Sequence, residues 1–268
     1  MPSGISMPQL NAPGFNLFDK WLSGRTGLIS MSLSNATGGE PRSDDYTLSV
    51  IQELFMWDAV SLFLLYLLDY FLRRLSALQP GGARARWFCI HSIGNAVVAA
   101  GTTRDLALCV LDHAESRQPA TSLMPAGAAF SLHLYHCLAF KLRPEDWSHH
   151  LLFVFGVTPL VVFHPTRAMC VCLFFCTGFP GMLDYWLLML VKTQKLEKWV
   201  QKRAAGFINA YLRMPGGALG ASLLIQDGIG TPGRGVGAAI LGGLMLANSA
   251  YYGHQAISSA ALYEYKKA

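Results

Sequence analysis

An all-α bundle of about seven membrane-spanning helices is the fold class that the sequence predicts. Hydrophobic residues make up 52% of the 268 residues and charged residues 14%, whereas a soluble domain carries about 25% charged residues. From residue 46 onward the chain repeats apolar stretches of about 20 residues, the length that crosses a bilayer. Because lipid offers no hydrogen-bond partners to an open sheet edge, these stretches are predicted to be helices.

The chain changes character at about residue 45. Residues 1–45 are rich in Gly, Ser, Pro and Asn and form a loose polar segment, whereas residues 46–268 form the predicted transmembrane domain. The predicted spans lie near residues 48–72, 87–111, 123–140, 147–163, 168–191, 204–225 and 236–262.

Local sequence features characterise the first five predicted spans. The first stops at the paired Arg73 and Arg74, and the third stops before Pro144, which separates it from a short fourth span. The second carries a polar stripe, and the fifth is continuous and leads into a basic run. Basic residues at the ends of apolar stretches are typical of membrane-protein loops.

The last two spans differ from the others in composition. Arg213 and Pro215 interrupt the sixth, which gives it the weakest apolar signal of the seven. The seventh is rich in Gly, Ala and Ser, and Gly237, Gly242 and Gly243 predict a surface where another helix approaches closely.

The loop charges support an odd number of spans. Basic residues concentrate in the loops after the first, third, fifth and seventh spans, as the positive-inside rule expects. This distribution predicts a cytosolic C-terminus and an N-terminus on the opposite side, where Asn35 stands in a glycosylation sequon. The basic side holds Arg73, Arg74, Arg84, Arg86, Lys141, Arg143, Lys192, Lys195, Lys198, Lys202, Arg203, Lys266 and Lys267, and the other side Arg42, Arg117, Arg167 and Arg234.

Charge and cysteine patterns exclude two other classes. The net charge of +5 comes from the loop clusters, without an aromatic and basic stripe or a nucleic-acid motif, so no nucleic-acid partner is expected. All six cysteines fall in apolar segments, where cysteine behaves as a small hydrophobe. They therefore indicate neither a disulfide framework nor a zinc site.

Polar residues inside the second predicted span form one candidate surface. His91, Asn95 and Asp105 fall along one helical stripe. Polar groups in a bilayer are costly, so they mark either a functional cavity or a hydrogen-bonded contact with a neighbouring helix. Both interpretations remain open from the sequence.

The densest polar stretch joins the third and fourth spans. His133 and His136 share a helix face, and His149 and His150 follow Asp146, which is placed to cap the next helix. Three interpretations compete: a metal site, acid–base or nucleophilic chemistry on a lipid, and interfacial packing. The clustered histidine boxes of membrane di-iron enzymes are absent from the sequence, so no metal or other cofactor is expected.

The fifth predicted span carries a buried acid. Pro180 and Gly181 are expected to loosen the helix, and Asp184 follows within the apolar stretch. An acid at this depth is expected to face the bundle interior, with a histidine as its natural counter-group.

The stretch Asp-Trp-Ser-His149-His150, an apolar span, and then Phe-Pro-Gly-Met-Leu-Asp184-Tyr185 resembles the core of TLC-domain proteins. The specific part covers about residues 132–192, and the broader likeness residues 87–263. The resemblance implies that His149, His150 and Asp184 occupy positions linked to acyl transfer in ceramide synthases. The preceding His-Asp of that family is replaced in this chain by Pro180 and Gly181, which disfavours ceramide synthesis and favours the other branch of the family.

We therefore expect a lipid-binding, lipid-homeostasis or lipid-modifying membrane protein that has membrane lipids as partners. The expected cavity lining is His91, Asn95, Asp105, His133, His136 and Tyr185. One alternative is a non-catalytic accessory subunit bound to other membrane subunits, and the disfavoured one is a ceramide-synthase-like acyltransferase. The sequence leaves enzymatic activity open, with a non-enzymatic role favoured. The expected location is a membrane of the endoplasmic reticulum type, with a mitochondrial or plastid membrane as the alternative because residues 1–45 are Ser-rich and contain few acids.

Overall fold

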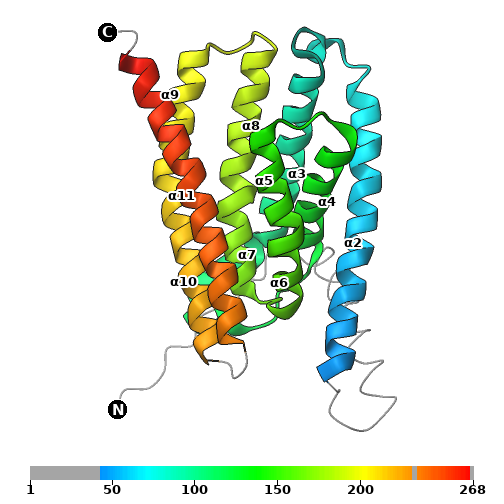
Figure 1. Cartoon of the computed structure of the whole chain (residues 1–268), viewed down its shortest axis with the longest axis vertical. Helices are drawn as coiled ribbons and strands as arrows, with labels where there is room; N and C mark the ends of the chain where they lie inside the picture. The colour runs from blue at the N-terminus through cyan, green and yellow to red at the C-terminus, as the bar shows by residue number, and fades with distance from the viewer. Residues whose placement is uncertain (1–42, 231–233, 266–268) are drawn as a thin grey trace, which may run out of the picture. The chain divides into compact units, whose positions relative to one another are not determined.

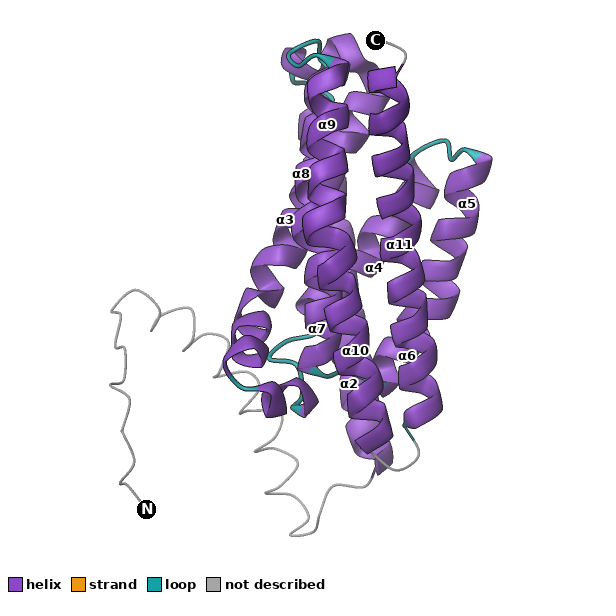
Figure 2. Cartoon of the chain, turned by 90° about the vertical axis from the view of Figure 1, so that its left-hand side faces the viewer, coloured by secondary structure: helices purple, strands orange, loops and turns teal. Residues whose placement is uncertain are grey.

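A computed structural model describes residues 43–230 and 234–265 of the chain. Contacts divide the chain into two units, Met1–Tyr46 and Thr47–Ala268, and the second unit holds the bundle. The predicted loose segment 1–45, apart from its last residues, and its sequon lie outside the described residues. Within these residues the unit is helical and contains no strand, as the sequence predicts, and Pro119 and Thr166 form an isolated bridge (Figure 2).

In the described ranges the helices follow one another as seven rods, three of which are interrupted by a short segment. The rods are α2 (Ser43–Leu72); α3 (Gly82–Leu111); α4 (Met124–Ala139); α5 (Pro144–Leu151), η3 (Leu152–Val157) and α6 (Thr158–Phe163); α7 (Arg167–Leu173), η4 (Phe174–Gly178) and α8 (Phe179–Lys192); α9 (Lys198–Ile208), η5 (Asn209–Arg213) and α10 (Met214–Gly230); and α11 (Gly235–Tyr265). The short helices η1 (Ser76–Gly81) and η2 (His113–Arg117) lie in the connections before and after α3.

Three of the described stretches are long and apolar enough to cross a membrane: Tyr46–Leu72, Asp146–Phe163 and Arg167–Lys192. These three helices have the length and composition of an integral membrane protein. The other four predicted spans do not reach the same standard. A physical reason is visible in two of them, because α4 has only 16 residues and α3 carries buried polar groups such as Asp105.

The loops alternate between two ends of the unit. The α2–α3 and α8–α9 connections and the C-terminal end of α11 lie at one end, and the α10–α11 turn lies at the other (Figure 1). The basic residues of the α2–α3 and α8–α9 connections, which the sequence places on one side of the membrane, therefore lie at the same end of the bundle.

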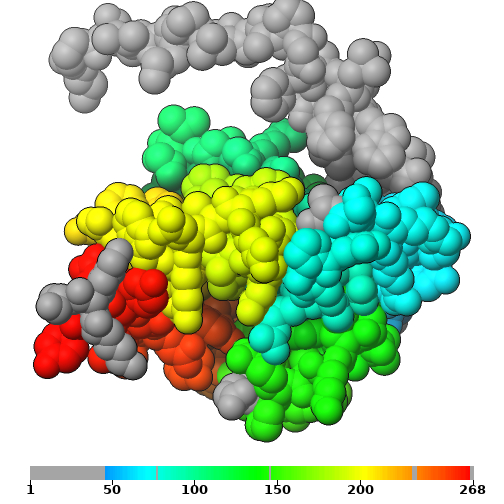
Figure 3. All heavy atoms as spheres, turned by 90° about the horizontal axis from the view of Figure 1, so that it is seen from above, coloured from blue at the N-terminus to red at the C-terminus, as the bar shows by residue number. Residues whose placement is uncertain are grey.

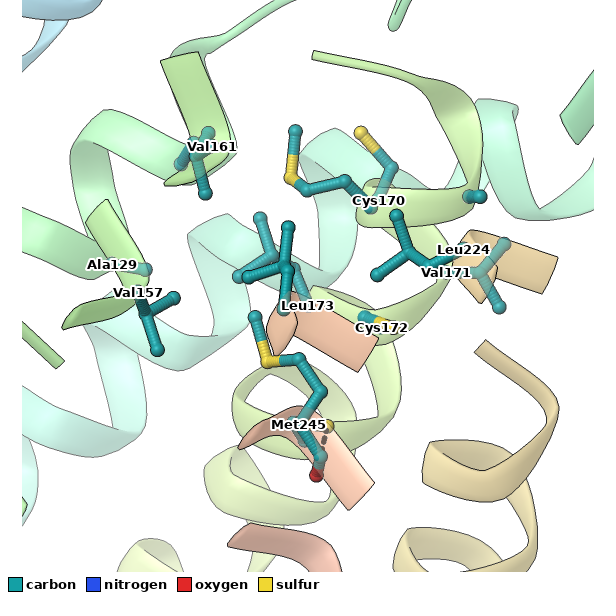
Figure 4. Packing of buried hydrophobic residues seen from close by; sticks show 14 of the residues in the cluster. Ala129, Val157, Val161, Cys170, Val171, Cys172, Leu173, Leu224 and Met245 are labelled. Carbon is teal, nitrogen blue, oxygen red and sulfur yellow. Dashed lines mark hydrogen bonds between the residues drawn. The ribbon is translucent and has the colours of Figure 1, made fainter. Parts of the chain in front are cut away.

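The fifth rod forms the centre of the main hydrophobic core. Every residue from Ala168 to Leu173 is buried, because this stretch carries apolar or thiol side chains all the way round the helix (Figure 4). Leu224 on α10 and Met245 on α11 belong to the same core. The cysteines in this stretch behave as small hydrophobes, as the sequence predicts.

Small residues allow α10 and α11 to approach each other and the core. A Cβ added to Gly242 would meet the backbone of α10 at 3.0 Å from Ala221 O. A Cβ at Gly220 would meet the backbone nitrogen of Cys172 at 2.8 Å. The predicted close-contact surface therefore includes Gly242, whereas its neighbour Gly243 faces open space.

Acidic residues attach α2 to the rest of the bundle. Glu53 accepts a hydrogen bond from the backbone nitrogen of Leu123 at 3.0 Å, and Asp58 is bonded to Ser131. Asp69 is 1% exposed and accepts from Tyr135 at 3.0 Å, and it also pairs with Arg86. Each acid has a partner on another element, as buried charges require.

Wide turns interrupt three of the described rods, and each one precedes a proline. Five-residue hydrogen bonds run from Thr158 N to Phe153 O, from Phe179 N to Phe174 O and from Met214 N to Asn209 O. The residues that follow these donors are Pro159, Pro180 and Pro215. Proline lacks the N–H and clashes with the carbonyl four residues earlier, so a local π-type turn relieves the clash.

Candidate functional site

Five histidines from three helices converge in one cluster. His91 comes from α3, His133 and His136 from α4, and His149 and His150 from α5. His133 Nε2 lies 3.1 Å from His149 Nε2, and His136 Nδ1 lies 2.8 Å from His150 Nε2. Asp146 caps α5 with its side chain, as predicted, and this places His149 and His150 within the first two turns of the helix.

Backbone contacts set the proton positions in both histidine pairs. His133 Nδ1 lies 2.7 Å from Ala129 O, and His150 Nδ1 lies 2.6 Å from Asp146 O. A carbonyl only accepts, so these nitrogens carry the protons, and in the neutral rings the Nε2 atoms of His133 and His150 are acceptors. His149 Nε2 and His136 Nδ1 are then the donors. The remaining basic nitrogens are Nδ1 of His149 and Nε2 of His136.

Aromatic rings enclose the histidines. Trp87 stacks on His136 with a centroid separation of 3.4 Å, and Tyr185 stacks on His91 at 4.2 Å. Phe153 stacks on His133 at 3.9 Å. These flat contacts hold the rings in place and exclude water, while the buried Nε2 atom of His91 has no hydrogen-bond partner among the described residues.

A second polar group lies beside the cluster. Asp184 on α8 accepts a hydrogen bond from Asn209 Nδ2 at 2.9 Å and pairs with Arg213 at 3.3 Å. Arg213 also donates to Asn209 Oδ1 at 2.8 Å. The prediction that a histidine would be the counter-group of Asp184 is therefore wrong. The wide turn η5 brings Asn209 and Arg213 to the carboxylate instead.

Tyr252 on α11 links the two groups. Its ring centroid lies 5.2 Å from that of His149 and 5.9 Å from the Cζ atom of Arg213. Oδ1 of Asp184 and Nε of Arg213 are buried without a hydrogen-bond partner in the part of the chain that the structure describes. The site therefore contains both an acceptor and a donor that a polar ligand could satisfy.

The space next to His149 is small. A cavity of about 20 Å³ lies between His149 and the side chains of η3, η4 and α11, among them Phe153, Thr177 and Met245. This volume is that of about one water molecule. Figure 3 shows a hollow between α11, the α8–α9 end and the segment that contains α5.

Most of the residues predicted to line a cavity come together at this site, and one does not. His91, His133, His136 and Tyr185 join His149 and His150, and Asn95 lies against Gly181 and the Asp184 group. Asp105 lies away from the cluster, because it follows His91 by about four turns along α3, a helix of 30 residues. There it pairs with Arg167 at 3.4 Å and accepts from Thr121 N.

Several members of the site were not predicted from the sequence. Arg213 was interpreted only as an interruption of a span, although a charged residue inside an apolar stretch is itself a functional signal. Trp87, Asn209 and Tyr252 gave no such signal, because their roles depend on which helices pack together.

His164 is separate from the cluster. It is 1% exposed and lies in the α6–α7 connection against Gly237. Burial lowers the pKa of His164, and the nearby charge of Arg234 lowers it further. It is a buried neutral histidine of the fold.

The imidazoles of the cluster bond mainly to one another. Four of the five use ring nitrogens in the two histidine pairs. Within 43–230 and 234–265, no set of three or more His, Cys, Asp or Glu side chains has the arrangement of metal ligands.

No family model, curated protein or solved structure matches this chain. The resemblance to TLC-domain proteins stays a prediction from the sequence stretch that contains His149, His150 and Asp184.

Proposed function

We propose that this chain is a TLC-like integral membrane protein that binds the polar end of a membrane lipid at the histidine cluster, in a lipid-homeostasis role. The observation that carries the proposal is the position of His149. It joins the polar cluster on one side and, on the other, a small cavity between η3, η4 and α11 that has a mainly apolar lining. A lipid presents the same combination of a polar end and an apolar chain.

The unsatisfied atoms of the site suit a headgroup with both donors and acceptors. Asp184 Oδ1 accepts, Arg213 Nε donates, and the Nδ1 atom of His149 is basic. A hydroxyl or an amine in the headgroup would bond to these atoms. Because the inner cavity is only about 20 Å³, the acyl chains would remain outside the bundle, in the bilayer.

The same geometry defines the chemistry if the protein modifies its lipid. His149 Nδ1 would take a proton from a lipid hydroxyl or amine, while its Nε2–H remains bonded to His133. The resulting imidazolium would be stabilised by that bond. The TLC resemblance implies an acyl-CoA donor: the lipid oxygen or nitrogen would attack the thioester carbonyl, the C–S bond would break as the ester or amide forms, and the imidazolium would return its proton to the departing thiolate.

Lipid mass spectrometry tests the proposal. Protein is extracted gently from membranes as wild type and as His149→Ala, and co-purifying lipids are quantified. We expect one lipid class to fall at least about tenfold in the variant, which corresponds to about 1.4 kcal/mol. His254→Ala is the matched control, because His254 is exposed on α11, outside the cluster. Equal lipid content in wild type and His149→Ala would refute the proposal.

The filled interior favours a second function, that of an accessory subunit in a larger membrane assembly. The outer face of α2 is apolar and exposed, with Phe55, Phe63 and Phe71 at 69%, 60% and 61% exposure. A partner subunit would cover such a face. If other proteins co-purify in fixed ratio and no lipid depends on His149, this second function replaces the first.

The complete topology is part of the same proposal. All seven rods would cross the bilayer, with the basic end in the cytosol, in a membrane of the endoplasmic reticulum type or, as the alternative, of a mitochondrion or plastid. The grouping of the basic loops at one end of the bundle supports this arrangement.

A further inference from the structure

A second concave surface lies away from the histidine cluster, between α9, η5 and α11. These elements lie side by side near the C-terminal end of α11 (Figure 1). The groove between them has a volume of about 340 Å³, which lies within the range of ligand-binding pockets. It is lined by Arg203, Gly206, Phe207, Ala210, Tyr211, Ile257, Ala260, Ala261 and Glu264.

Small side chains form the floor of this groove and aromatic side chains form its wall. Gly206 faces Ala260, and a Cβ added to Gly206 would lie 3.1 Å from the Ala260 Cβ. Phe207 and Tyr211 are 63% and 68% exposed. The groove residues of α9 and η5 occupy positions 203, 206, 207, 210 and 211, which lie on one helix face, so the groove follows the helix axis for about 12 Å.

The rim of the groove carries one charge of each sign. Arg203 and Glu264 pair at 3.2 Å, with side chains 66% and 61% exposed. Such an exposed pair contributes little stability and opens readily to other partners. The pair lies at the basic end of the bundle, where the headgroup region of a bilayer would be.

We infer that this groove binds one acyl chain of a zwitterionic phospholipid, with the phosphate at Arg203 and the headgroup ammonium at Glu264. The floor and aromatic wall fit a hydrocarbon chain, and the two rim charges match the two charges of the headgroup. Lys198 and Lys202 add cationic charge at the same end. Burial and the charge of Lys198 lower the pKa of Lys202, which a nearby phosphate would counteract.

Native mass spectrometry of the full-length protein in detergent tests this inference. The protein is titrated with phosphatidylcholine and phosphatidylglycerol of equal chain length. We expect wild type to retain one phosphatidylcholine, Ala261→Trp to reduce that retention at least tenfold, and Phe207→Ala to reduce it several-fold. Ala247→Trp, at an exposed alanine of α11 outside the groove, is the control and should retain the lipid.

The headgroup assignment has its own variant. Glu264→Gln removes the negative charge that would face the choline ammonium and should abolish the preference for phosphatidylcholine over phosphatidylglycerol. Equal retention of the two lipids by wild type, or unchanged retention by Ala261→Trp, would overturn the inference. Disulfide crosslinking of Ala261→Cys to another chain would also overturn it and identify the groove as a helix-docking surface.

Lipid binding in the groove is independent of the histidine cluster. His149→Ala is expected to leave lipid retention in the groove unchanged. One of the two lipid-binding proposals can therefore be refuted without the other.

Discussion

At the scale of single residues, the buried charges are the most informative feature of this chain. Arg213 is 7% exposed and Asp184 is its ionic partner, in a region where charges are expensive. Hydrophobic residues of similar volume would often be as stable as a buried ion pair, so stability alone does not account for this pair.

Removing one member of this pair should be far more harmful than removing both. Arg213→Met should lower the free energy of unfolding by about 3–5 kcal/mol, because Asp184 would remain buried without its cation. Arg213→Met/Asp184→Leu should recover most of the loss. Unfolding in mixed detergent micelles measures these changes. Arg203→Met is the control at an exposed ion pair, where a change below about 1 kcal/mol is expected. Additive effects of the two core substitutions would contradict the pairing.

At the scale of helices, the wide turns η3, η4 and η5 position the site. Each π-type turn inserts about one extra residue and rotates the following helix by about 100° relative to a regular α-helix. Asn209 and Arg213 bound the turn η5, and Cys176 and Thr177 lie in η4, two turns of helix from Asp184. Prolines at 159, 180 and 215 supply the local cause.

Replacing Pro215, the proline after η5, should therefore weaken the ion pair between Arg213 and Asp184. In Pro215→Ala the clash with the carbonyl of Tyr211 disappears, and an ordinary helical turn becomes available. We expect the coupling energy between Arg213 and Asp184, from a double-mutant cycle in this background, to fall below about 0.5 kcal/mol. Pro144→Ala is the matched control, because Pro144 stands at the first residue of α5 without a wide turn. An unchanged coupling energy would show that packing, rather than the proline, maintains η5.

At the scale of the whole molecule, charge and hydropathy set the orientation in the membrane. The apolar stretches Tyr46–Leu72 and Arg167–Lys192 give the clearest crossings. The α2–α3 and α8–α9 connections lie at the same end of the bundle as the C-terminal end of α11, beside which the groove lies. In the proposed topology, lipid headgroups at the groove would therefore meet the protein on its cytosolic side.

Cysteine labelling tests this orientation. An impermeant maleimide added to sealed microsomes, whose cytosolic face is outward, should label Gln194→Cys in the α8–α9 loop, whereas Gln118→Cys in the η2 loop should react only after permeabilisation. Five of the six native cysteines are buried and the sixth, Cys137, is partly so, which gives a low background that unsubstituted protein measures. Labelling of both positions from the same side would exclude seven crossings.

The sequence by itself determined the helical class, the ends of most rods, the burial of the α3 stripe and the end at which basic residues gather. These properties follow from local hydropathy, capping residues such as Asp146, and prolines, each of which acts within a few residues. Only the tertiary structure decided that His133 pairs with His149, that Arg213 rather than a histidine meets Asp184, and that Asp105 stands apart from them. Such pairings depend on how far each helix is rotated about its axis, and the wide turns change that rotation in ways that hydropathy does not encode.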